Sequence, residues 1–236
     1  MSSAAITATH ATDQATGESF FATLCAANAD LHHASMTHPF VAGIGAGSLS
    51  DDAFAAYLAQ DYLFLAQYVR AQALGAASSP DLALMGQMVA LLHSTLAEEL
   101  DNLIALYEQF GGTRAALAAT EALPACQAYT DHLLTTAHAG SLFWTLASML
   151  PCQWGYGEIG RALQSAGLPQ DPRFRQWIAE YAADSYHELV ADVIERFDAL
   201  AAEESIYARE RAAQIFRLSS RHELAFWEMA GVGARL

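Results

Sequence analysis

The chain is built from long stretches with helical periodicity, and this pattern restricts its fold more than any other feature. From Ser19 onward, Gly, Pro and Ser separate these stretches, and alternating runs of β-branched residues, typical of strands, are absent. The pattern predicts about seven helices, over residues 19–35, 50–79, 81–111, 124–138, from 141 through Pro151, 172–202 and 204–229. No repeat or linker divides them, so we predict one all-α, single-domain helical bundle over residues 19–236.

Three segments carry their own local predictions. Residues 1–18 are rich in Ser, Ala and Thr without apolar periodicity, which predicts a mobile N-terminal tail. The Gly-rich segment 43–47 is expected to be a loop, and it contains no lysine that would make it a phosphate-binding loop. Pro151 lies inside a predicted helix and should kink it.

Composition excludes several classes of function. The net charge of −15, from 26 acidic and 11 scattered basic residues, disfavours contact with nucleic acid. No run of roughly 18 apolar residues predicts a membrane span. Three widely spaced cysteines do not form a disulfide framework, and no signal peptide precedes them, so we expect a cytoplasmic protein. The apolar content of 53% is compatible with self-association.

A carboxylate interrupts one predicted apolar helix face. Asp61 shares that face with Phe54, Tyr57, Leu65 and Tyr68. A buried carboxylate is costly unless it is paired or binds a ligand. Asp61 is therefore either held by a tyrosine or a helix end, or it is functional, and the pattern leaves both interpretations open.

The segment around Pro151 has the composition of a pocket wall. Cys152 and Tyr156 are i,i+4 neighbours, so their side chains should face the same way. However, a free cysteine in apolar surroundings is more often a small buried apolar residue than a reactive one. Judged by itself, this segment favours a structural role for Cys152.

The last predicted helix carries Glu223 and Phe226, which are three residues apart and therefore lie next to each other on the helix surface. Ser220 to Glu223 also matches a capping box, which would indicate a helix restart. The neighbouring His222 has no second histidine at the spacing of a zinc motif. Aromatic residues elsewhere are candidates for holding a flat ring, although each is individually more often core: Phe64, Tyr129, Trp177, Tyr181 and Phe226.

Together these motifs resemble the TenA or thiaminase II family. The resemblance rests on Asp61 to Leu65, Leu150-Pro151-Cys152, Tyr156-Gly157-Glu158, and Ser219 through Glu223 to Trp227, in an order and spacing that match from about Phe20 to Met229. It implies a heme-oxygenase-like bundle that binds no heme, needs no metal or redox cofactor, and assembles as a homotetramer. Cys152 is similar to the cysteine of the cysteine-bearing branch.

The resemblance also implies an activity and a set of site residues. The expected enzyme is an aminopyrimidine aminohydrolase (thiaminase II), which converts 4-amino-5-aminomethyl-2-methylpyrimidine, or thiamin, to 4-amino-5-hydroxymethyl-2-methylpyrimidine. Cys152 matches the nucleophile, Glu223 the carboxylate on a ring nitrogen, and Asp61 the carboxylate on the amino group. The residues that match pocket-lining positions are Tyr129, Tyr156, Tyr181, Phe226 and Phe64, the last of which is tyrosine in some members.

Two other classes of function compete with this hypothesis. One is a non-catalytic pyrimidine-binding or transcription-associated regulator, against which the acidic charge argues if direct DNA contact is needed. The other is an iron-binding oxygenase that uses His93, Glu98 and Glu99. We predict that these three residues form a solvated helix face instead, because their spacing is not a Glu-x-x-His pair.

Overall fold

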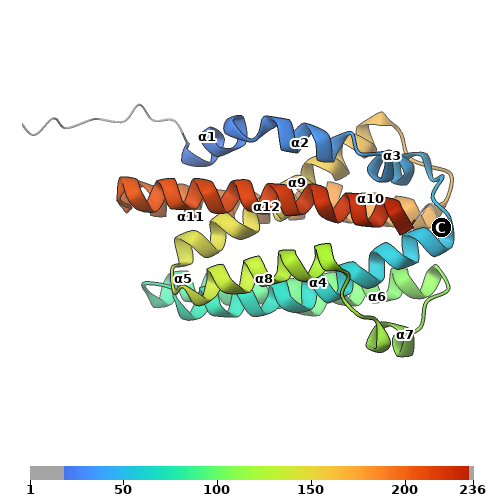
Figure 1. Cartoon of the computed structure of the whole chain (residues 1–236), viewed down its shortest axis with the longest axis horizontal. Coiled ribbons are helices and arrows are strands. Elements are labelled where there is room, and N and C mark those ends of the chain that lie inside the picture. The colour runs from blue at the N-terminus through green and yellow to red at the C-terminus, as the bar shows by residue number, and fades with distance from the viewer. Residues whose placement is uncertain (1–18, 234–236) are drawn as a thin grey trace, which may run out of the picture.

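The computed structural model describes residues 19–233, and every regular element within that range is helical (Figure 1). The elements are α1 (Phe20–Ala27), α2 (Ala29–Met36), α3 (Pro39–Ala46), α4 (Asp51–Ala77), α5 (Leu82–Ser94), the π-helical turn η1 (Thr95–Glu99), α6 (Leu100–Gln109), α7 (Arg114–Ala119), α8 (Pro124–His138), α9 (Leu142–Ala166), α10 (Pro172–Ala182), α11 (Asp184–Glu203) and α12 (Ile206–Gly233). The predicted all-α bundle is confirmed for these residues. The predicted tail, residues 1–18, lies outside the described residues, as do the last three residues of the predicted domain.

The long helices pack into a bundle around α9. Helix α9 contacts α12, α10, α11 and α8, and α4 packs against α8 and α5. In Figure 1, α12 runs through the middle of the molecule, the short helices α1 to α3 lie along one side of it, and α4, α5 and α8 lie along the other. Within residues 19–233, no helix combines the length and apolar character that crossing a membrane requires.

The Gly-rich segment 43–47 is mostly helical, so the predicted loop is wrong. Pro39 starts α3, and the helix ends at Gly47, which adopts a positive φ of 61°. A Cβ at Gly43 would lie 2.6 Å from the Leu49 side chain. Glycine is needed there for close packing rather than for a flexible loop, a distinction that composition does not reveal.

Three predicted helices are divided in the structure. The first breaks at Asn28, whose side chain donates to the Leu24 carbonyl (2.8 Å) and accepts from Arg217 (3.0 Å). The sixth breaks at Ala183, which is extended at φ −62° and ψ 137°. The third contains the π-helical turn η1. In contrast, α12 continues through Ser220 to Glu223, as the predicted helix over 204–229 requires, so the alternative of a helix restart at the capping box is not realised. Helix α9 likewise continues through Pro151.

Two clusters of buried apolar side chains form the core of the described residues, and α9 contributes to both. Phe143, Leu146 and Leu150 belong to one cluster. Met149 and Tyr156 belong to the other. The Pro151-Cys152 segment therefore lies where the two clusters meet. Phe54, Tyr57, Leu65 and Tyr68 are buried as their shared helix face predicts.

Adding a side chain at Gly160 should destabilise the fold, because α9 and α10 pack closely there. A Cβ at Gly160 would lie 2.6 Å from the backbone carbon of Tyr181, whereas a Cβ at Gly155, also in α9, meets nothing within 4 Å. We expect Gly160→Ala to lower the free energy of unfolding by about 1–3 kcal/mol. Gly155→Ala should raise it by up to about 1 kcal/mol, because alanine favours a helix. Urea unfolding followed by circular dichroism measures both, and equal effects would contradict the close packing.

Candidate active site

A cavity of about 380 Å³ lies between α4, the α5–η1–α6 segment, α9, α10 and the start of α11. Five of the eight site residues expected from the sequence line it: Asp61, Phe64, Cys152, Tyr156 and Tyr181. Cys152 and Tyr156 line the same cavity, as their i,i+4 spacing in α9 predicts. The Cys152 thiol is half-buried, so it is not a fully enclosed core cysteine like Cys126.

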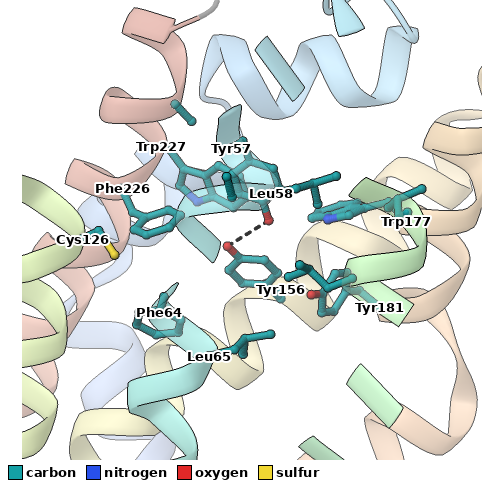
Figure 2. Close-up of a cluster of buried hydrophobic side chains, with 14 of the residues drawn as sticks. Tyr57, Leu58, Phe64, Leu65, Cys126, Tyr156, Trp177, Tyr181, Phe226 and Trp227 are labelled. Carbon is teal, nitrogen blue, oxygen red and sulfur yellow. Dashed lines mark hydrogen bonds between the residues drawn. The ribbon is translucent and has the colours of Figure 1, made fainter. Parts of the chain in front are cut away.

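The other three expected residues pack directly behind this wall. Glu223 and Phe226 come from α12, and Tyr129 comes from α8. The Phe64 ring, which faces the cavity, lies 4.8 Å from the Tyr129 ring and 5.8 Å from the Phe226 ring, measured between centroids. Figure 2 shows Phe64 and Phe226 on one side of Tyr156, with Tyr181 on the other. Five helices, α4, α8, α9, α10 and α12, therefore bring all eight residues to one region.

Cys152, Glu223 and Tyr129 form a chain of polar contacts. The Tyr129 hydroxyl donates to Glu223 Oε1 at 2.6 Å. The Cys152 thiol and the Glu223 carboxyl are close enough for each to shift the pKa of the other. Burial raises the pKa of Glu223 to about 7, and the contacts with Tyr129 and Cys152 partly offset that rise. Burial, with the nearby Glu223, Glu99 and Asp61 carboxyls, raises the pKa of the Cys152 thiol well above its usual value.

Asp61 is held by a tyrosine, as one of the two interpretations predicts, and it also lines the cavity, so a functional role stays a prediction. Its side chain is 3% exposed, and its Oδ2 accepts from the Tyr57 hydroxyl at 3.2 Å. The Tyr57 hydroxyl also lies 3.2 Å from the Tyr156 hydroxyl, the contact drawn as a dashed line in Figure 2. Burial raises the pKa of Asp61 to about 7, and Tyr57 lowers it again in part. Near neutral pH this carboxyl can both donate and accept a hydrogen bond.

The structure adds cavity residues that were not expected from the sequence. Glu99 is half-buried and lines the cavity, so its predicted place on a solvated face is wrong, whereas His93 and Glu98 are exposed as predicted. The reason is the π-helical turn η1, which changes the direction of side chains at its end.

Further residues of the cavity wall are Tyr68, Gln153, Glu180 and Tyr186. Tyr68, seven positions after Asp61 on the same helix face, is the one that periodicity identifies. Trp177, a candidate from the sequence, is core, since it packs behind Tyr181.

The cavity is acidic and aromatic. Five carboxyl groups line the cavity or lie next to a residue that lines it: those of Asp61, Glu98, Glu99, Glu180 and Glu223. The cavity lining contains no Arg, Lys or His. Within residues 19–233, no three His, Cys, Asp or Glu side chains group in a way that could hold a metal ion. The arrangement offers flat aromatic surfaces for a ring, carboxyl groups for a polar edge, and one thiol in contact with a carboxyl group.

The chain resembles curated proteins and solved structures along most of its length. It is 38% identical to an aminopyrimidine aminohydrolase of Halalkalibacterium halodurans over 90% of this chain and 95% of that protein. It is 33% identical to the aminopyrimidine aminohydrolase of Bacillus subtilis, over 86% of each. A TenA homologue from P. horikoshii superposes with a TM-score of 0.85 at 27% identity, covering 92% of this chain and 100% of that one.

A more distant structure bears on the fold alone. A domain of unknown function with a heme oxygenase-like fold, from Shewanella denitrificans, superposes with a TM-score of 0.71 at 16% identity, covering 92% of this chain and 94% of that one. The expected heme-oxygenase-like bundle is thereby confirmed. Residues 26–231 match the TENA/THI-4/PQQC family, and with the relatives above this match shows that the chain belongs to that family.

Proposed function

We propose that this chain is an aminopyrimidine aminohydrolase of the thiaminase II type. Its substrate would be 4-amino-5-aminomethyl-2-methylpyrimidine, with thiamin as a second substrate, and its product 4-amino-5-hydroxymethyl-2-methylpyrimidine. The observation that carries the proposal is Cys152, which lines an aromatic cavity and whose thiol lies close enough to the Glu223 carboxyl for each to shift the pKa of the other. The relatives named aminopyrimidine aminohydrolase support the choice of substrate class.

Asp61 suits the amidine edge of an aminopyrimidine. This edge presents an amino N–H donor beside a ring-nitrogen acceptor. A protonated carboxyl group offers the complementary acceptor and donor, and the raised pKa of Asp61, about 7, keeps much of this group protonated near neutral pH. Phe64 and Tyr156 offer ring faces in the same cavity for stacking.

Glu223 is the group best placed to take the Cys152 proton. The thiol is a weak nucleophile until it loses that proton, and its pKa is raised by burial. In the proposed step Glu223 accepts the thiol proton and passes it to a ring nitrogen while the sulfur adds to a ring carbon. The added electron density then expels the amine, which leaves as ammonia after gaining a proton. Water adds to the exocyclic methylene, and loss of the thiol restores the aromatic ring.

Turnover by the wild-type protein tests this proposal directly. We expect ammonia and the hydroxymethylpyrimidine to form in equal amounts from the aminomethyl compound, and faster than thiamin is cleaved. Ammonia is measured by a coupled assay and the pyrimidine by chromatography. A folded protein that turns over neither compound would contradict the proposed activity and favour a binding or regulatory role. The cytoplasmic location and the homotetramer stay predictions from the sequence.

A further inference from the structure

One part of the cavity brings acidic side chains together with no Arg or His side chain in its lining. Glu99 ends the η1 turn and Glu180 lies in α10, and both are half-buried and line the cavity. Glu99 accepts from the Tyr181 hydroxyl (3.4 Å) and Glu180 accepts from Asn102 (3.4 Å). In the described part of the chain neither carboxyl group makes an ion pair with Arg or His. The ordinary partner of a half-buried carboxylate is therefore missing.

The two carboxyl groups also act on each other. Burial, followed by the charge of Glu180 and then that of Asp61, raises the pKa of Glu99 to about 8. Burial raises the pKa of Glu180 to about 7. A bound cation between these groups would remove their repulsion and favour the ionised form of each. This is the electrostatic requirement for a cation subsite.

Two unsatisfied polar atoms point to a ligand independently of the charges. The Tyr68 hydroxyl and the Gln153 amide oxygen have no hydrogen-bond partner in the described structure, although the two side chains are only 2% and 7% exposed and both line this cavity. Buried polar atoms of this kind nearly always have a partner. Tyr68 lines the same cavity as Cys152 and Glu99, and the charges of both act on its hydroxyl.

We propose that Glu99, Glu180, the Tyr68 hydroxyl and the Gln153 amide oxygen form a subsite for a protonated primary amine, the leaving group of the substrate. The inference rests on the proposed function and names the feature of the substrate that this chain selects. An ammonium group has three N–H donors and no acceptor, and the subsite supplies acceptor oxygens and negative charge. The amine is attached to the ring through one methylene, so it must lie close to the thiol that attacks the ring. Tyr68, Glu99 and Cys152 line the same cavity, as this requires.

A binding experiment separates the subsite from catalysis. The Cys152→Ser protein is titrated by calorimetry with the aminomethylpyrimidine and with the neutral hydroxymethylpyrimidine. Adding Glu99→Gln should weaken binding of the amine about 10- to 100-fold, the effect of losing a charge-assisted hydrogen bond, and change binding of the neutral compound less than about twofold. Glu180→Gln should act in the same direction. Asp101→Asn removes a charge from an exposed position two residues from Glu99 and should leave both affinities unchanged.

The outcomes distinguish the subsite from the proposed function. Equal loss of both ligands in Glu99→Gln, or loss of neither, would overturn the subsite even if the wild-type enzyme is active. The same selective loss in Asp101→Asn would also overturn it, because a long-range field would then explain the effect. Selective loss in Glu99→Gln alone, in a protein without turnover, would establish the amine subsite and overturn only the proposed reaction. Thermal unfolding of each variant excludes loss of folding as the cause.

Discussion

Replacing Cys152 with serine should lower kcat for the aminomethylpyrimidine by a factor on the order of 10³ or more. A serine hydroxyl has a far higher pKa than a thiol, and in the proposed reaction the sulfur itself adds to the ring. The substitution keeps a small polar side chain in the cavity wall, so substrate binding should change little. Ammonia release at saturating substrate measures the effect, and the KM value or the calorimetric Kd shows that the pocket is intact.

A second cysteine provides the control for this prediction. Cys25 is half-buried in α1 and does not line the 380 Å³ cavity. Cys25 shares a small second pocket with Glu223 but has no part in the proposed reaction, so Cys25→Ser should keep kcat within about twofold of the wild type. Turnover at the wild-type rate in a folded Cys152→Ser protein would rule out covalent catalysis by this thiol.

Replacing Glu223 with glutamine should lower kcat by about 10²–10⁴-fold, the usual contribution of a positioned acid or base. Glutamine still accepts the hydrogen bond from Tyr129 through its amide oxygen, so the local structure should be kept. It cannot take the proton from Cys152, whose pKa is raised by burial and by the surrounding carboxyl groups. The loss should therefore appear in kcat, with little change in the affinity for the neutral product.

The pH profile tests the same role with the wild-type protein. Burial raises the pKa of Glu223 to about 7, so the carboxyl group is protonated at lower pH and ionised at higher pH. Only the ionised form can accept the thiol proton, so kcat/KM should fall about tenfold for each pH unit below about 7. If kcat/KM instead stays level or rises as the pH falls below 7, Glu223 must enter the reaction already protonated.

Asp61 is the matched control, because burial raises its pKa to about 7 as well. In the proposed role the protonated Asp61 binds the amidine edge. The amide of Asp61→Asn offers the same acceptor and donor, so KM should change little and the acid limb of the profile should stay. If the acid limb instead survives in Glu223→Gln and disappears in Asp61→Asn, the base that accepts the thiol proton is Asp61.

Local spacing predicted the all-helical character of the chain and several side-chain positions, although not every helix boundary. Asp61 lies on the buried face of α4 because that face repeats with the helical period, and Cys152 and Tyr156 face one cavity because residues four apart share a side of a helix. The resemblance to a family then joined Glu223 and Tyr129 to the same site, which no local pattern in α8 or α12 indicates.

Only the tertiary structure decided how these helices meet and which further residues enter the site. The sequence near Glu99 looks like a solvated face, and the turn η1 directs this side chain into the cavity instead. Glycines 43 and 45 look like a loop, and they allow α3 to pack closely against its neighbours. These outcomes depend on contacts outside the helix itself, such as those of Gly45 with Leu163 and of Glu99 with Tyr181, whereas periodicity records only what lies within a few turns of one helix.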